Sequence, residues 1–266
     1  MKRFLLVALL IGSASWAQVD EATTESGSAD LQKQIQNPVA DLISLPFQNN
    51  IDFGIGPDDR TRNTLNIQPV IPFSINENIN LITRTILPVI SQPVGANDSE
   101  FGIGDTNLSL FLTSAKPKKT IVGYGLAVGL PTATDRVLGT GKWTAGPSIV
   151  VLVQPGNWTI GGLAQNAWSF AGQSDRANVN LFYSQIFVVK NLANGWYVNS
   201  APIITANWEA SSDNQWTVPL GAGAGKLFKA GKLPINAQVG YYYNVVTPDF
   251  GPTSQLRFQV VLLFPK

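Results

Sequence analysis

From about residue 42 onward, apolar and polar side chains alternate along segments of roughly 10 to 13 residues. In residues 120–130, large apolar side chains occupy every second position from Val122 to Leu130, and the positions between them are glycine or alanine. In the last segment, apolar residues from Leu256 to Phe264 alternate with polar ones that include Arg257. A period of two places alternate side chains on opposite faces of a β-strand, so the pattern predicts strands.

The same reading, applied to the whole chain, predicts about twelve strands separated by two kinds of connection. Compact connections fall at 75–78, 115–119, 154–157, 190–195 and 227–232, and longer ones, each with an acidic residue, fall at 56–62, 91–100, 131–142, 170–177, 209–214 and 247–252. Outer-membrane barrels pair short periplasmic turns with longer external loops. The predicted strands are 42–54, 63–73, 79–90, 103–113, 120–130, 144–153, 158–169, 178–189, 196–207, 215–226, 234–245 and 255–264.

Composition decides which all-β fold these strands form. The chain is 44% hydrophobic and only 13% charged, which is about half the charged share of a soluble protein. Such a chain suits a wall that meets lipid outside and encloses a polar lumen. Segments 79–90 and 149–153 are apolar on both faces, so a secreted β-sandwich or a soluble barrel is the alternative. We therefore predict a transmembrane antiparallel up-and-down β-barrel of about twelve strands in the cell outer membrane.

Six tryptophans fall near the predicted strand ends, where amphipathic rings anchor at lipid headgroups. Packing in a core is the competing explanation for any one of them. They are Trp143, Trp158, Trp168, Trp196, Trp208 and Trp216.

The N-terminal region divides into two parts. Residues 1–17 have a basic start, an apolar stretch and the small-x-small end Ser15-Trp16-Ala17, which is typical of a signal peptide. Residues 18–41 are polar and acidic with a possible short helix at 29–36, and we expect a periplasmic segment there, with simple disorder as the alternative. The barrel is expected over residues 42–266, with both termini in the periplasm. No apolar run approaches the length of a transmembrane helix.

Several kinds of chemistry are excluded by what the chain lacks. It contains no cysteine and no histidine, so thiolate nucleophiles, sulfur-based zinc sites and the usual general base are missing. The adjacent loop acids Asp58 and Asp59 read as solvated side chains. The 18 basic and 17 acidic residues nearly cancel, which argues against nucleic-acid binding. We expect no enzyme, no metal and no cofactor.

Two arginines within strands are candidates for the lumen. Arg84 and Arg257 would cost about 2 to 4 kcal/mol if they faced lipid near the midplane, so they should point inward. They could form an electrostatic element of a pore. The alternative is a structural role, in which they pair with luminal acids such as Asp105 or Glu209.

The connection 131–142 is the longest predicted external loop, and it contains Asp135, Arg136 and Lys142. It is a candidate constriction loop, with an ordinary flexible loop as the alternative. Gly102, Gly104 and Asp105 resemble a phosphate-binding glycine loop, but the Lys-Ser/Thr ending and the following helix are missing. A bend in a barrel strand explains them better.

Several stretches resemble a known bacterial family. They are QNPVADLISLPFQNN at 36–50, FGIGD at 101–105, LPTATD at 130–135, GTGKW at 139–143 and IITANWE at 203–209. The chain resembles the outer-membrane β-barrel family associated with the meta-pathway of phenol degradation, whose members are often mislabelled neuromedin U. The resemblance runs from about residue 36 to 266. It implies a membrane barrel that transports small aromatic or hydrophobic compounds, and it carries over no catalytic residue.

The expected function is thus an outer-membrane channel or transporter for small solutes, and a non-transporting structural or adhesive barrel is the alternative. The expected partners are outer-membrane lipid, an unidentified small-molecule solute and the barrel assembly machinery. The last follows from the terminal aromatic strand, whose resemblance to the assembly signal is imperfect because Pro265 and Lys266 follow Phe264.

Overall fold

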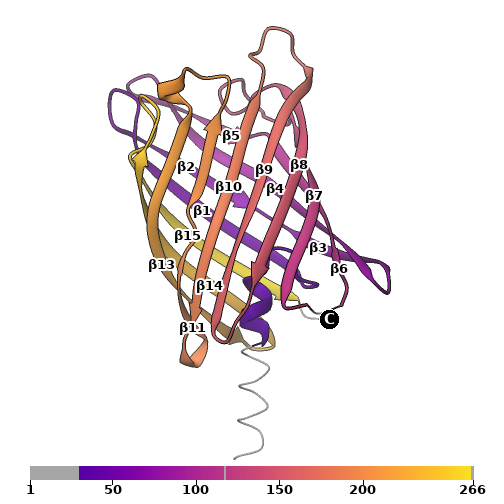
Figure 1. Ribbon diagram of the computed structural model, residues 1–266. Helices are drawn as coiled ribbons and strands as arrows, with labels where there is room; N and C mark the ends of the chain where they lie inside the picture. The colour runs from indigo at the N-terminus through magenta and orange to yellow at the C-terminus, as the bar shows by residue number, and fades with distance from the viewer. Residues whose placement is uncertain (1–29, 117, 265–266) are drawn as a thin grey trace, which may run out of the picture.

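The computed structural model describes residues 30–116 and 118–264, which form an antiparallel β-barrel (Figure 1). The predicted signal peptide at 1–17 lies outside the described residues. The strands are β1 (Ile43–Ile55), β2 (Arg60–Ile67), β3 (Val70–Asn76), β4 (Ile79–Val94), β5 (Asp98–Ile103), β6 (Thr106–Ser114), β7 (Thr120–Leu130), β8 (Lys142–Val153), β9 (Trp158–Gly172), β10 (Asn180–Asn191), β11 (Trp196–Ser200), β12 (Ile203–Asn207), β13 (Trp216–Ala230), β14 (Leu233–Val246) and β15 (Ser254–Phe264).

These segments make twelve crossings of the barrel wall, because three crossings are interrupted. β2 and β3 form one crossing, β5 and β6 another, and β11 and β12 a third, each broken by two residues. Proline lacks the N–H that a sheet ladder needs, and Pro69 and Pro202 lie in two of these breaks. The barrel is closed, since β1 pairs with β15 along its length and β9 pairs with β10. The predicted fold is confirmed.

Several strands extend further at the loop end than predicted. β4 continues to Val94, and β5 begins at Asp98 and pairs with it, so most of the predicted loop 91–100 is a β-hairpin. Alternation of apolar residues locates only the lipid-crossing part of a strand. A polar extension such as Asp98–Glu100 is stabilised by backbone hydrogen bonds and leaves no such pattern.

The outer surface of the barrel is apolar in its middle and carries tryptophans near both ends. Outward residues such as Leu126, Val239 and Phe258 are 44% exposed each, which is the surface that lipid covers. Trp158 and Trp196 begin strands at the end with the short turns. Trp143, Trp168, Trp208 and Trp216 lie at or near strand ends on the loop side. This distribution matches two interfacial girdles.

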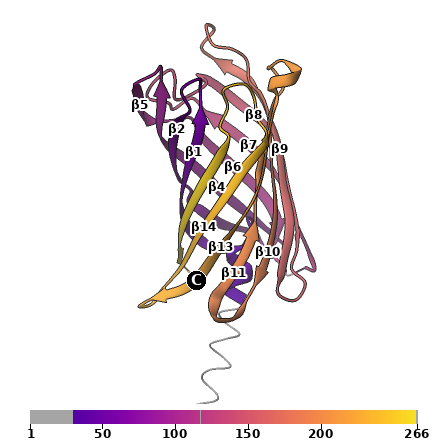
Figure 2. The ribbon, with the colours of Figure 1, turned by 90° about the vertical axis from the view of Figure 1, so that its left-hand side faces the viewer.

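The described ends of the chain lie at the same end of the barrel, where the short turns are (Figure 1). Ile43 at the start of β1 is paired with Phe264 at the end of β15. The helix predicted near 29–36 is present over residues 30–35. No helix among the described residues is long and apolar enough to cross a membrane. Figure 2 shows the tilted strands from the side.

One strand glycine allows a close approach between neighbouring strands. A Cβ on Gly146 of β8 would collide with the carbonyl oxygen of Asn166 in β9. Gly146→Ala should therefore lower the free energy of unfolding by about 1 to 3 kcal/mol, measured by urea titration of the refolded protein. Gly162→Ala is the matched control, because its Cβ would meet only the Gln185 carbonyl oxygen at 3.7 Å. Equal losses in both variants would contradict this reading.

Candidate functional site: the barrel lumen

The luminal face of the barrel is polar in its middle and towards the loop end. Along β1, Gln48, Asn50 and Asp52 are buried inside, while Phe47 and Phe53 lie on the opposite, outward face. The period of two that predicts strands thus also separates the two faces. A polar lumen inside an apolar wall can hold water and dissolved molecules.

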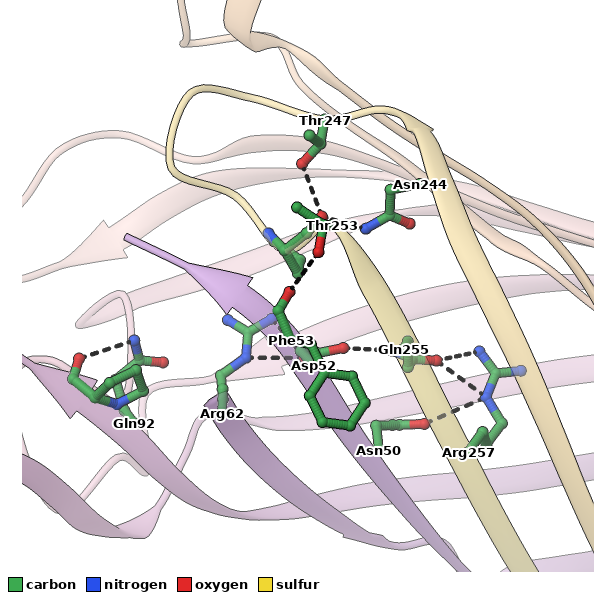
Figure 3. Close-up of polar contacts among 12 residues, drawn as sticks. Asn50, Asp52, Phe53, Arg62, Gln92, Asn244, Thr247, Thr253, Gln255 and Arg257 are labelled. Carbon is green, nitrogen blue, oxygen red and sulfur yellow. Dashed lines mark hydrogen bonds and ion pairs between the residues drawn. The ribbon is translucent and has the colours of Figure 1, made fainter. Parts of the chain in front are cut away.

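A chain of hydrogen bonds links β2, β1 and β15 across this face (Figure 3). Arg62 donates to Asp52 Oδ2 from Nε at 3.0 Å and from Nη2 at 2.9 Å. Gln255 donates to Asp52 Oδ1 at 2.7 Å, and Gln255 Oε1 accepts from Arg257 Nη2 at 2.8 Å. Arg257 Nε also donates to Asn50 Oδ1 at 3.2 Å. Both oxygens of Asp52 are therefore occupied.

Arg257 connects β15 to the break between β11 and β12. Its side chain is nearly buried, with the residue 2% exposed, and its Nη1 donates to the Ala201 carbonyl oxygen at 3.0 Å. The guanidinium lies 4.5 Å from the centre of the Tyr242 ring of β14. The chain interruption at Ala201-Pro202 frees this carbonyl from the sheet ladder. From inside the barrel, Arg257 thus contacts β1, β14 and the break between β11 and β12.

Arg84 lies on the luminal side of β4, and its Nη2 donates to Gln68 Oε1 at 2.6 Å. Neither Arg84 nor Arg257 pairs with the acids suggested by the sequence. Asp105 bonds to the loop 131–141 instead, and Glu209 is exposed in the connection after β12. The partners are wrong because alternation gives the face of a strand but not the height of a residue along the barrel.

The long loop 131–141 is anchored at the loop end of the barrel. Asp105, at the break between β5 and β6, accepts hydrogen bonds from the Ala133 and Thr140 amides at 3.2 and 2.6 Å and from the Thr140 hydroxyl at 2.8 Å. Arg176 donates to the carbonyl oxygens of Thr140, Arg136 and Gly139. The loop is therefore a fixed part of the wall.

This loop also packs against the luminal face. Leu138 is 6% exposed, and its atoms occupy the space that side chains at Gly102 and Gly104 would need. Ile90 of β4, which shares its face with the buried Ile82, also lies where a side chain at Gly104 would be. The loop thus lies against the inside of the barrel at its loop end, and the two glycines make room for it.

The remaining candidate residues lie at the rim. Arg136 pairs with Asp175 at 2.8 Å, with both side chains exposed, and this hydrogen bond lowers the pKa of the Asp175 carboxyl. Asp135 accepts a hydrogen bond from the Val137 amide inside the loop. Lys142 begins β8 and is partly buried. These residues shape the loop, and Glu209 lies in a different connection.

Asp105→Ala should release the loop from the mouth without unfolding the barrel, because the three hydrogen bonds that the carboxylate accepts belong to the loop. Trypsin should then cut after the exposed Arg136 about tenfold or more faster, since charge-assisted hydrogen bonds are strong. Asp213→Ala changes an acid in another loop, which accepts a hydrogen bond from the hydroxyl of its neighbour Ser212 at 3.5 Å, and should leave the rate unchanged. Equal rates in all three proteins would show that Asp105 does not hold the loop.

The N-terminal segment 30–42 lies inside the opposite, turn end of the barrel. Gln36 donates to Asn191 Oδ1 at 2.5 Å and accepts from the Thr159 hydroxyl at 2.7 Å. Gln154 donates to the Lys33 carbonyl oxygen at 2.8 Å. These bonds join the segment to β9, β10 and the turn before β9.

Apolar contacts hold the same segment on two sides. Val39 belongs to a buried cluster with Ile82, Phe111, Val150 and others on the wall. Ala40 and Leu42 pack with Leu227, Val261 and Leu263, and Leu31 and Ile35 of the helix lie against them. The segment is thus a plug that shares two apolar clusters with the barrel wall.

Two cavities flank the plug. One, of about 180 Å³, is lined by Arg84, Arg257, several amides and apolar residues of the plug and wall. The other, of about 700 Å³, lies at the turn end beside β4, β6 and β7. Asn37 and Ala40 line both, so the plug separates them. Two buried amide oxygens that line the first, on Asn199 and Asn236, lack a hydrogen-bond partner.

Sequence reasoning missed Asp52, Gln68, Gln255, Tyr242 and the plug. The available signal for the wall residues was a polar or aromatic side chain on the face shared with Arg84 or Arg257. The described part of the chain has no group of three metal-ligating side chains.

Comparison with known proteins finds no matching family model and no matching curated sequence. Among solved structures, an outer membrane channel from Pseudomonas putida F1 aligns with a TM-score of 0.64 and 17% identity, over 84% of this chain and 94% of that one. The NanC porin aligns with a TM-score of 0.54 and 8% identity, over 84% of this chain and all (100%) of that one. The outer membrane phospholipase A of Escherichia coli aligns at 0.43 with 13% identity, covering 83% of this chain and 96% of its own. The first two likenesses bear on the fold.

Proposed function

We propose that this chain is an outer-membrane channel for small solutes, with the turn end and both termini in the periplasm. The observation that carries the proposal is the polar lumen of a closed barrel whose outer surface is apolar. Such a wall is stable in lipid. Two solved structures that align above a TM-score of 0.5 are described as a channel and a porin, which supports the same reading.

The lumen suits small solutes. A barrel of about twelve strands is narrower than a porin of 16 to 18 strands, and here the loop 131–141 narrows one end while the plug fills the other. Amide side chains and two arginines line the space between them. Small aromatic or hydrophobic compounds, which the family resemblance suggests, fit the apolar part of this lining, and the proposal includes no catalytic step.

Two measurements test the proposal in sequence. Mature protein extracted in detergent should migrate differently on a gel before and after boiling, as folded membrane barrels do and a soluble sandwich does not. The folded protein should then give small, discrete conductance steps in planar lipid bilayers. Silence across many insertions of heat-modifiable protein would favour the structural or adhesive alternative, and lack of heat-modifiability would argue against the membrane barrel itself.

A further inference from the structure

The 180 Å³ cavity beside the plug carries an unbalanced charge. Of the residues that line it, only Arg84 and Arg257 are charged, and none is acidic. The described residues contain two ion pairs, Arg62 with Asp52 and Arg136 with Asp175, so neither cavity arginine has a carboxylate partner. Buried charges in proteins are normally paired. The cavity therefore attracts an anion.

The donors of Arg257 are only partly used. A guanidinium has five N–H groups. Nε bonds to Asn50 and Gln255, Nη2 to Gln255 and Nη1 to the Ala201 carbonyl, which leaves one N–H on each terminal nitrogen. Both accepting side chains are neutral. The nearest acid, Asp52, is already bonded by Arg62 and Gln255.

Arg84 has more free donors. Its one hydrogen bond goes from Nη2 to Gln68, so four of its five N–H groups remain available. It is also partly accessible, unlike Arg257. An anion in the cavity can therefore reach Arg84 without displacing a protein acceptor.

The rest of the lining is mixed, with polar amide side chains and a separate set of apolar ones. Phe187 and Val189 of β10, Leu42 before β1, and Val261 and Leu263 of β15 line the same space. Apolar walls favour a ligand that carries hydrocarbon along with its charge. A volume of about 180 Å³ holds on the order of a dozen water-sized groups, which limits the ligand to a small molecule.

We propose that this cavity binds a small monocarboxylate with a compact apolar body, its carboxylate facing Arg84 and Arg257 and its hydrocarbon facing Phe187, Val189 and Leu263. A carboxylate accepts two parallel N–H bonds from a guanidinium, which matches the free donors here. The assignment rests on the proposed function in one respect, that such a compound would be a solute of the channel. Binding itself does not require transport.

Calorimetric titration of the folded protein in detergent at pH 7 tests the proposal. The probe is benzoate, compared with benzamide, which has the same shape without charge, and with acetate, which has the charge without the apolar body. Benzoate should bind about tenfold or more tightly than either, because a charged hydrogen bond and apolar burial are each worth at least that factor. Arg84→Gln should weaken benzoate binding about tenfold.

The control variant is Lys226→Gln, which removes one positive charge beside Trp196 on the outer wall and should bind benzoate like the unchanged protein. Arg257→Gln should also weaken binding, but if it fails to fold, Arg84→Gln decides. No binding of benzoate, equal binding of benzoate and benzamide, or unchanged affinity in the folded arginine variants would each overturn the proposal. If the protein binds benzoate but gives no conductance in bilayers, only the proposed channel function is refuted. If it conducts but does not bind benzoate, only the proposed ligand is refuted.

Discussion

Deletion of residues 30–41 should raise the single-channel conductance of the refolded protein several-fold. These residues fill the turn end of the lumen, where they separate the two cavities. Their removal joins the two cavities. Water then fills the space that the side chains occupied, and dissolved ions can move through that water. A chain that begins at Asp30 keeps the plug and is the matched control, so it should keep the lower conductance.

The same deletion should also lower the stability of the barrel. It removes Leu31, Ile35, Val39 and Ala40 from the two apolar clusters and exposes their partners on the wall. Each large buried side chain contributes about 1.5 to 3 kcal/mol to the free energy of unfolding. The temperature to which the sample must be heated before its gel mobility changes should therefore fall. Equal conductance in the deleted and control chains would mean that the plug does not limit the pore.

Much of the wall could be predicted from the sequence. Alternation of apolar and polar residues depends only on the geometry of a strand between lipid and a lumen, so it located the crossings and the face of Arg84 and Arg257. It could not supply their partners. Asp52 and Gln255 are 203 positions apart in the chain and are brought together only when β1 pairs with β15.

The plug was harder to predict for a different reason. Residues 18–41 look polar as a whole, and a polar terminus is expected to stay outside the barrel. Leu31, Ile35 and Val39, however, recur at every fourth position, and in the structure these three side chains meet the wall. Leu31 and Ile35 lie on the helix, whereas Val39 lies beyond its end and joins a different cluster. Nothing in the segment itself indicates that the surface covering these side chains is the inside of the same barrel.

Arg257→Glu should be the most destabilising single substitution in the lumen. The oxygens of Asn50, Gln255 and Ala201 now accept from the guanidinium, and a carboxylate in its place would face acceptors only. The position is 2% exposed, so the new charge would be buried without a partner. Breaking a buried charged contact costs about 3 to 5 kcal/mol, and urea titration followed by tryptophan fluorescence should show a loss of that size or failure to refold.

Two variants show whether the loss comes from charge reversal at this site. Arg257→Gln keeps an amide that can still donate to the Ala201 carbonyl oxygen, so it should lose less stability than Arg257→Glu. Arg84→Glu makes the same charge change at a partly accessible position with a single protein acceptor, Gln68, and should refold. If Arg257→Glu were as stable as Arg84→Glu, the brace from β15 to Ala201 would contribute little, because the surrounding acceptors would then tolerate a carboxylate as well as a guanidinium.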